Sequence, residues 1–215
     1  MKKKITIIDY GLGNLFSLQR ALSYLGFDSK VTKDSNEIEK SDKLILPGVG
    51  AFETGMKNLE KNDLIEPIKN FKATGKNLLG ICLGMQLLLD SSEEGGHHKG
   101  LGYIPGNVTK FSLPNSDENN YKIPQVGWNK IFPSDKGAKS WKSNLLKDIK
   151  LDSYFYFVHS YFVNVKNKDE SLAFTKYGRD EFSSVIKKEN FIGTQFHPEL
   201  SSDEGLKILN AFIEL

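Results

Sequence analysis

The chain's only cysteine lies in the stretch Leu78-Leu79-Gly80-Ile81-Cys82-Leu83-Gly84-Met85-Gln86, between two glycines and after an apolar run. This order of residues predicts a strand, a sharp turn and the start of a helix. A nucleophile on such a turn needs glycine on both sides, because a Cβ there would collide with the neighbouring strand and helix. We expect Cys82 to point into solvent at the helix N-terminus, where free N–H groups can bind a developing oxyanion. The alternative interpretation is a buried structural cysteine.

Composition limits the classes to which the chain can belong. Its 215 residues suffice for one substantial core, so we expect a single domain spanning residues 1–215. The net charge is only +2 and its lysines and acids are interspersed, which predicts no nucleic-acid partner. One cysteine excludes an internal disulfide and suits a reducing compartment. The apolar run Ile5 to Ile8 is too short for a signal peptide and no segment approaches a membrane span, so we expect a cytoplasmic protein with no membrane partner.

Strands and helices alternate in the N-terminal half. Strands are predicted at Lys4 to Asp9, Phe27 to Thr32, Lys43 to Leu46 and the run before Cys82, and helices after Asn14, at Phe52 to Leu59 and at Leu64 to Phe71. Such alternation predicts a mostly parallel α/β sheet that binds ligands at the carboxyl ends of its strands. Pro47-Gly48-Val49-Gly50 and Cys82 both follow strands at that edge. The two glycines allow the backbone to approach a ligand closely or to change peptide orientation, although an ordinary turn also fits.

The residues after Cys82 change in pattern. We expect the helix to run to Asp90 and a polar loop to follow from Ser91 to Gly100. The adjacent His97 and His98 on that loop have no acid or cysteine at ligand spacing, so no metal site is predicted. Mostly antiparallel strands and a closing helix from Ser202 to Ile213 are expected beyond Gly106. The strands are predicted at 108–111, 128–132, 154–159, 172–177, 182–187 and 191–195.

A second set of reactive residues follows the last predicted strand. His197 and Glu199 are two residues apart, so on an extended segment their side chains leave on the same face, with Pro198 stiffening the backbone between them. The carboxylate can then orient the imidazole. A cysteine on a turn and a carboxylate-held histidine are the nucleophile, base and orienting group of acyl transfer. Taken alone, the His-x-Glu pair also fits an exposed strand end.

Two motifs in this order and spacing, Gly80 to Gln86 and Gln195-Phe196-His197-Pro198-Glu199, closely resemble those of the class I (triad) glutamine amidotransferases. Within that class, four further motifs are similar to those of the glutaminase subunits of imidazole glycerol phosphate synthases. They are Ile8-Asp9-Tyr10-Gly11-Leu12-Gly13-Asn14-Leu15, Pro47-Gly48-Val49-Gly50, Val126-Gly127-Trp128-Asn129 and Tyr154-Phe155-Tyr156-Phe157-Val158-His159-Ser160-Tyr161. The resemblance covers nearly the whole chain.

The resemblance implies a flavodoxin-like α/β fold, with a central mostly parallel sheet flanked by helices and additional antiparallel strands in the C-terminal half. It also implies a catalytic triad of Cys82, His197 and Glu199 that hydrolyses L-glutamine, with no cofactor. The ammonia would pass to a separate (β/α)8-barrel cyclase subunit in a heterodimer. That subunit would form imidazole glycerol phosphate and AICAR in histidine biosynthesis.

The resemblance also assigns roles by position. It places the oxyanion hole at the backbone of Val49, Gly50 and Leu83. Glu94 would neutralise the α-ammonium group of the substrate, although a solvated loop acid also fits, and Tyr161 also fits a core position. The residues implied for the glutamine pocket are Gln86, Glu94, His159, Ser160 and Tyr161.

The sequence departs from the family pattern at two positions. Gln125 stands where the family often has histidine after proline, and Leu200 stands where Lys or Arg usually follows His-Pro-Glu. The resemblance implies that both positions, with Asn14 and Trp128, face the partner subunit. The departures leave open a paralogous glutaminase that supplies a different synthase, such as a sugar amidotransferase. A third hypothesis, an inactive partner-binding subunit, is disfavoured by the intact triad.

Overall fold

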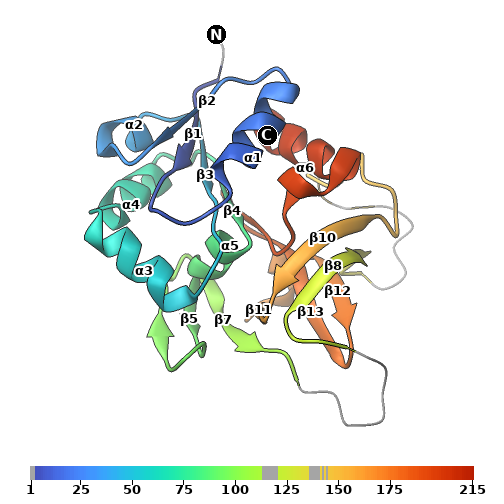
Figure 1. Cartoon of the computed structure of the whole chain (residues 1–215). Coiled ribbons are helices and arrows are strands. Elements are labelled where there is room, and N and C mark those ends of the chain that lie inside the picture. The colour runs from blue at the N-terminus through green and yellow to red at the C-terminus, as the bar shows by residue number, and fades with distance from the viewer. Residues whose placement is uncertain (1–2, 113–120, 136–140, 142, 144) are drawn as a thin grey trace.

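Eight strands form the central sheet of the computed structural model, which describes residues 3–112, 121–135, 141, 143 and 145–215 (Figure 1). The first five strands in the sheet are parallel and the last three are antiparallel to their neighbours. In spatial order the strands are β2 (Ser29–Thr32), β1 (Ile5–Ile8), β3 (Lys43–Leu46), β4 (Leu78–Ile81), β14 (Phe191–Thr194), β13 (Asp180–Lys188), β12 (Ser171–Tyr177) and β9 (Phe132–Pro133). The predicted parallel sheet with a C-terminal antiparallel extension is therefore confirmed.

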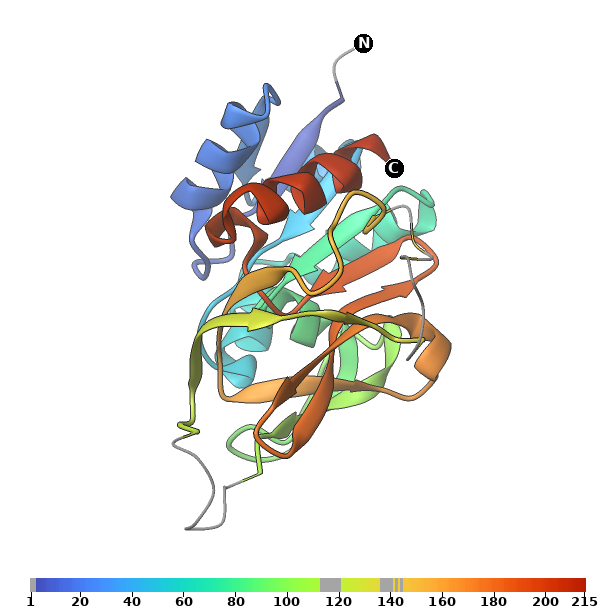
Figure 2. The same ribbon diagram turned by 90° about the vertical axis from the view of Figure 1, so that its right-hand side faces the viewer.

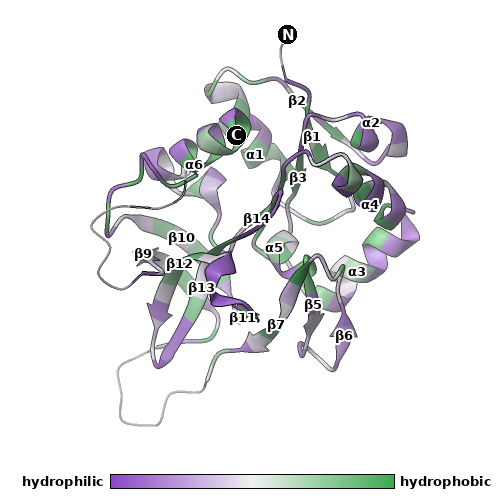
Figure 3. Ribbon diagram, turned by 180° about the vertical axis from the view of Figure 1, so that it is seen from behind, coloured by the Kyte–Doolittle hydropathy of each residue, from purple (hydrophilic) through white to green (hydrophobic). Residues whose placement is uncertain are grey.

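Helices cover both faces of the parallel part, as Figures 1 and 2 show. One face carries α1 (Leu15–Tyr24) and α6 (Ser202–Glu214), and the other carries α2 (Ser35–Glu39), α3 (Phe52–Lys61), α4 (Ile65–Ala73) and α5 (Leu83–Leu87). The strands divide their side chains between the two layers by alternation. Ile45 packs in the core under α1 and α6, whereas its neighbours Leu44 and Leu46 pack in the core on the other side. Apolar residues accordingly concentrate in the middle of the molecule (Figure 3).

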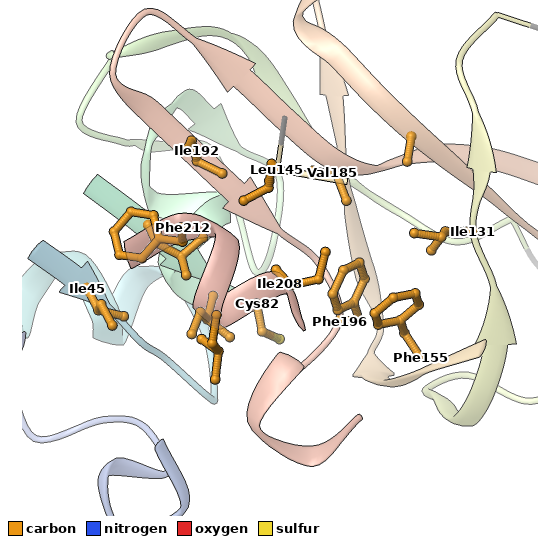
Figure 4. Packing of buried hydrophobic residues seen from close by; sticks show 14 of the residues in the cluster. Ile45, Cys82, Ile131, Leu145, Phe155, Val185, Ile192, Phe196, Ile208 and Phe212 are labelled. Atoms are coloured by element: carbon orange, nitrogen blue, oxygen red, sulfur yellow. The ribbon is translucent and has the colours of Figure 1, made fainter. Parts of the chain in front are cut away.

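The core beneath α6 reaches the predicted catalytic turn. Ile208 and Phe212 of α6 pack in one buried cluster with Phe155, Phe196 and Cys82 (Figure 4). The rings of Phe155 and Phe196 lie 4.2 Å apart between centroids. Burial of each such side chain contributes about 1.5–3 kcal/mol to folding. This packing joins α6, the strand that carries Phe155 and the segment that carries Phe196 to the turn that carries Cys82.

Two smaller sheets complete the fold, and all of their strands follow α5 in the sequence. One pairs β8 (Gln125–Lys130) with β10 (Tyr154–His159) in antiparallel register. The other has the order β11 (Tyr161–Val165), β7 (Ile104–Lys110), β5 (Leu89–Ser92) and β6 (His98–Lys99). Single 3-10 turns occur at η1 (Lys168–Glu170) and η2 (Pro198–Leu200). Only Ser160 separates β10 from β11, so the chain passes from one sheet to the other at that residue.

The structure differs from the prediction around residues 88–100. The helix after Cys82 ends at Leu87 rather than Asp90, because Leu89 pairs with Ile104 in the sheet formed by β5 and β7. The predicted polar loop contains the end of β5 and the short strand β6. Helix α2 and strand β11 were not predicted. None of the helices in the described residues is both long and apolar enough to cross a membrane.

Candidate active site

The turn that carries Cys82 is a strand-to-helix elbow. Cys82 follows β4 directly, has a φ of 52° and is the N-cap residue of α5. The two flanking glycines lie against backbone. A Cβ on Gly84 would lie 1.8 Å from the carbonyl oxygen of Leu46 in β3, and a Cβ on Gly80 would lie 2.7 Å from the carbonyl oxygen of Gly84. The predicted steric requirement for glycine on both sides of the cysteine is confirmed.

The prediction that Cys82 points into solvent is wrong. The residue is buried, with a relative exposure of 5%. Its thiol donates a long hydrogen bond to the carbonyl oxygen of Val158, with 3.8 Å between sulfur and oxygen. The expectation was wrong because Val158 and Gln195, from distant parts of the chain, close over the turn. Cys82 is therefore a buried residue that lines a cavity rather than an exposed surface residue.

The His197–Glu199 pair lies beside this turn because β14 pairs in parallel with β4. The N–H of Cys82 donates to the carbonyl of Thr194 across that pairing, at 2.8 Å. His197 Nδ1 donates to Glu199 Oε1 at 2.8 Å, and both side chains are buried. The segment is not extended as expected, since Pro198–Leu200 form the turn η2, yet the predicted contact between imidazole and carboxylate is present.

The electrostatics of His197 are set by its two partners. Burial alone would lower the pKa of His197, but the charge and hydrogen bonding of Cys82, followed by those of Glu199, raise that pKa well above its ordinary value of 6.5. Within the described part of the chain, His197 Nε2 makes no hydrogen bond of good geometry. The two partners thus favour the protonated ring, and Nε2 is left for chemistry.

A cavity of about 320 Å³ opens onto Cys82, a volume typical of small-molecule sites. The structure brings together here the residues predicted for the oxyanion hole and the glutamine pocket. The lining residues are Val49, Gly50, Cys82, Leu83, Gln86, Glu94, Pro124, Val158, His159, Ser160 and Tyr161. Sequence reasoning did not assign Pro124 and Val158, although each directly precedes an assigned residue.

Polar side chains of the cavity wall are held by specific contacts. Glu94 Oε2 accepts a hydrogen bond from the N–H of Phe52, the first residue of α3, at 2.7 Å. Gln86 Nε2 donates to the carbonyl oxygen of Tyr161 at 2.9 Å and to Gln195 Oε1 at 3.2 Å. Glu94 is therefore fixed at the wall, and the amide hydrogens of Gln86 are engaged within the protein.

Tyr10 is a buried residue of this region that sequence reasoning did not assign. Its hydroxyl donates to the carbonyl oxygen of Pro47 at 2.7 Å, next to the glycine loop. Burial and then the charge of Cys82 raise the pKa of Tyr10 far above its usual range, so the hydroxyl stays a donor. Beyond this anchor, Gly50 has a φ of 106° and its Cβ position is open. One end of the loop is thus fixed and the other end has room to reorient.

His159 occupies an aromatic part of the cavity wall. Its Nδ1 donates to the carbonyl oxygen of Tyr161 at 2.8 Å, and its ring lies 5.0–5.7 Å from those of Phe111, Phe157 and Phe182. Burial lowers the pKa of His159 to about 4, the hydrogen bond to Tyr161 opposes that shift, and the charge of His197 adds to it. His159 is therefore neutral at pH 7.

The depressed pKa of His159 predicts a loss of stability in acid. The unfolded chain binds this proton more tightly, so the contribution to stability is complete above pH 6.5 and is lost as the pH falls toward 4. Between pH 7 and pH 5 the free energy of unfolding, measured with urea, should decrease in the wild type. This decrease should be about 2 kcal/mol larger than the decrease in His159→Gln. His97→Gln, on the exposed loop, is the control and should behave as the wild type. Equal decreases in wild type and His159→Gln would contradict the assignment.

The residues predicted to face a partner do not all lie on the surface. Asn14, Trp128 and Leu200 are exposed, and Trp128 has a relative exposure of 52%. Gln125 is only 2% exposed, and its Oε1 has no hydrogen-bond partner among the described residues. The strand alternation of β8 turns Gln125 inward and its neighbour Val126 outward, with a relative exposure of 60%.

The exposed side chains form an apolar surface on β8 and β10. Val126 pairs with Val158, and Trp128 pairs with Tyr156, on adjacent antiparallel strands. The backbone N–H of Tyr156 donates to Ser201 Oγ, and the carbonyl oxygen of Tyr156 accepts from the N–H of His197. The turn that carries Leu200 therefore adjoins this sheet. Sequence reasoning assigned only Trp128 and Leu200 on this surface. The alternating pattern of residues 154–159 was the available signal for the others.

No group of three or more metal-ligating side chains occurs in the part of the chain that the structure describes. His98 lies in β6, with its Nδ1 3.9 Å from Glu53 Oε1.

Comparison with known proteins identifies the family of this chain. Residues 6–215 match the family described as glutamine amidotransferase class-I. A relative from Caldanaerobacter subterraneus subsp. tengcongensis, named imidazole glycerol phosphate synthase subunit HisH, is 48% identical over 211 residues that cover 98% of each chain. Another from Legionella pneumophila (strain Lens), named imidazole glycerol phosphate synthase subunit HisH 1, is 45% identical and covers 98% of this chain and 99% of its own.

Solved structures share the fold at lower identity. A crystal structure of a glutamine amidotransferase superposes with a TM-score of 0.70 at 18% identity and covers 97% of both chains. PurLQS from Thermotoga maritima gives a TM-score of 0.67 at 18% identity, with 100% of this chain and 99% of that chain covered. These structures show the shared fold. The family match over residues 6–215 and the relatives at 45% and 48% identity establish that the chain belongs to the class-I glutamine amidotransferases, within the family of HisH subunits.

Proposed function

We propose that this chain is the glutaminase subunit of an imidazole glycerol phosphate synthase, which hydrolyses L-glutamine and passes the ammonia to a cyclase subunit. The observation that carries the proposal is the position of Cys82 on the cavity wall, with the buried His197–Glu199 pair at the end of the adjacent strand. The relationship to HisH proteins supports the pathway.

In the first half-reaction the Cys82 sulfur attacks the carboxamide carbon of glutamine. The oxygen gains negative charge, and the backbone N–H groups of Leu83 and of the Val49 and Gly50 segment are the proposed donors to it. Leu83 is the first residue of α5, where helical N–H groups lack intrahelical partners. Each such donor contributes about 3 kcal/mol in comparable acyl-transfer sites.

His197 acts as acid and then as base. The raised pKa of His197 keeps the imidazolium beside the sulfur, from which Nε2 gives a proton to the departing ammonia. A thioester between Cys82 and the glutamyl group remains. Neutral His197 then removes a proton from water, the resulting attack releases glutamate, and the proton stays on the ring. Glu199 holds the ring in one orientation through Nδ1.

The proposed substrate contacts follow from the cavity lining. Glu94 supplies the negative charge for the α-ammonium group. Its Oε2 also accepts the hydrogen bond from the N–H of Phe52 at the start of α3. Gln86, His159, Ser160 and Tyr161 form the wall that bounds the rest of the amino acid. Neutral His159 places no charge against the substrate.

The proposed partner is a (β/α)8-barrel cyclase subunit in a heterodimer. The apolar surface of β8 and β10, extended by Leu200, adjoins the cavity through Val158, which is both exposed and cavity-lining. Exposed Val, Trp and Tyr side chains grouped on one sheet are typical of a protein interface. A partner docked there would receive ammonia without release to solvent.

The test is glutamine hydrolysis with and without a histidine-pathway cyclase and its acceptor substrate. We expect low activity from the isolated chain, because the Gly50 end of the loop has room to turn a carbonyl to where the oxyanion donor belongs, and a large increase in the complex. Glutamate release is the measurement. Absence of hydrolysis in every condition would refute the glutaminase assignment, and equal rates in all conditions would refute the gating by the loop.

A second candidate is a glutaminase that supplies a different synthase, and Leu200 favours it. A Lys or Arg at this position would pair with an acid of the cyclase, which Leu200 cannot do. The same experiment therefore includes Leu200→Lys. If the natural partner is a different synthase, the wild type should bind a conventional cyclase weakly and Leu200→Lys should bind it at least about 10-fold more tightly. Tight binding of the wild type, unchanged by the substitution, would support the histidine pathway.

A further inference from the structure

We propose that the side-chain amide of Gln195 is a catalytic group, which donates a hydrogen bond to the Cys82 thiolate and is held in that orientation by Gln86 and the carbonyl of Tyr161. The inference rests on the proposed function, because it concerns the sulfur as the attacking atom. None of the roles assigned above to the triad or the oxyanion hole includes Gln195.

The central sheet places Gln195 against the sulfur. Cys82 is the first residue after β4 and Gln195 is the first after β14, and the preceding residues Ile81 and Thr194 are paired in register. Gln195 is fully buried, and its Nε2 lies 3.7 Å from Cys82 Sγ. Its own N–H donates to the carbonyl of Ser184 at 2.9 Å, which fixes its backbone. Strand pairing rather than a loop therefore sets this contact.

A chain of hydrogen bonds decides which end of the Gln195 amide faces the sulfur. The Tyr161 carbonyl can only accept, so Gln86 presents its NH2 group to it at 2.9 Å. The same NH2 group donates to Gln195 Oε1 at 3.2 Å. The Gln195 NH2 group is left to face Cys82. Rotation of either amide would bring two donors or two acceptors into contact in a buried site, which is unfavourable.

The two neighbours of the sulfur suit its two protonation states. A thiol has a hydrogen to donate, and the Val158 carbonyl accepts it at 3.8 Å. A thiolate can only accept, and the Gln195 NH2 group then supplies the donor. Hydrogen bonds to charged groups are stronger than those to neutral groups. The amide therefore favours the form of Cys82 that attacks.

Other groups that act electrically on Cys82 remain in place when Gln195 is replaced. They include His197, from the segment after β14, and Tyr10, from the loop after β1, and the acid Glu94 lines the same cavity. Tyr10 stays protonated because burial raises its pKa, so His197 carries the neighbouring charge. His159 acts on His197 and is neutral at pH 7. A change in the behaviour of the sulfur is then attributable to position 195.

The experiment measures alkylation of the full-length chain by iodoacetamide as a function of pH. Cys82 is the only cysteine, so the rate reports this sulfur alone. Gln195→Glu keeps an oxygen for Gln86 but places an acceptor against the sulfur. The midpoint of its alkylation profile should rise by about one pH unit or more, which corresponds to a rate about tenfold lower at pH values below the midpoint. Gln195→Met removes the donor without adding a carboxylate and should shift the midpoint in the same direction by about half a unit. Ser184→Ala, at a buried hydroxyl next to Gln195, is the control and should match the wild type.

Steady-state kinetics of the complex provide the second measurement. Gln195 is not among the cavity-lining residues, so kcat for glutamine hydrolysis should fall about 10-fold in Gln195→Glu while KM changes less than about twofold. Unshifted alkylation midpoints in either folded variant, or a raised KM with an unshifted midpoint, would overturn the proposal. Alkylation needs neither glutamine nor a partner. If the proposed function is wrong, hydrolysis will be absent but the alkylation midpoints of the Gln195 variants will still be shifted. That outcome differs from a failure of the inference about Gln195, in which the midpoints do not shift.

Discussion

Cys82→Ala and Cys82→Ser should abolish glutamine-dependent synthesis by the complex, with a loss of about 10⁴-fold or more in kcat, and leave ammonia-dependent synthesis intact. The sulfur is the only group in the cavity positioned to form the thioester, and His197 and Glu199 have no function in hydrolysis without it. Ammonium salt bypasses this step because the acceptor reaction needs only free ammonia. The two rates are measured on the same preparation of complex, with glutamine or ammonium as the nitrogen source.

The ammonia-dependent rate is also the control for folding and assembly. Wild-type protein alkylated with iodoacetamide should behave like Cys82→Ala, since the chain has no other cysteine. Retention of most glutamine-dependent turnover by Cys82→Ala would show that the triad is assigned wrongly. Equal loss of both activities would show that the substitution damages the complex rather than the chemistry.

Gly84→Ala should be the most destabilising single methyl addition to the catalytic turn, with a loss above about 4 kcal/mol in the free energy of unfolding. Its Cβ would lie 1.8 Å from the carbonyl oxygen of Leu46, and both groups belong to the backbone of packed elements. Neither α5 nor β3 can move aside without breaking the core between them. Urea unfolding of the isolated chain measures the effect.

Gly26→Ala separates steric overlap from backbone strain. Gly26 has a φ of 82° and no atom within 4 Å of its Cβ position, so alanine there should cost only about 1–2 kcal/mol. A Gly84→Ala protein as stable as Gly26→Ala would show that α5 separates readily from β3, which the elbow geometry does not allow. Glutamine hydrolysis should be lost in Gly84→Ala and retained in Gly26→Ala.

The parallel core was predictable because its strands are continuous apolar runs bounded by turn residues. The predicted bounds of β3 and β10 agree with the structure, as does the glycine that ends α1. Helix α2 was missed because it has five residues and one buried side chain, Ile38, which is too little for a helical period. The first two residues of β5 were predicted as helix, because consecutive leucines carry no period, and its last two were predicted as loop; only pairing with β7 decides their structure.

Strand β11 was missed for a different reason. No turn residue separates it from β10, and the single residue Ser160 marks a change of sheet rather than a hairpin. The composition of the site was predictable from motifs, whereas its enclosure was not. Covering of Cys82 by Val158 and Gln195, and the inward position of Gln125, depend on pairings between residues far apart in the chain.

The position of β14 has a consequence for synthesis of the protein. β14 is the last strand in the sequence, yet it lies between β4 and β13 in the middle of the central sheet. A nascent chain interrupted before residue 191 therefore has β4 with an open edge, and Cys82 lacks the Thr194 carbonyl, Gln195, His197 and Glu199. The ribosome must therefore translate through residue 199 before the thiol acquires the histidine proposed as its acid and base. On the proposed mechanism, such incomplete chains cannot release ammonia from glutamine.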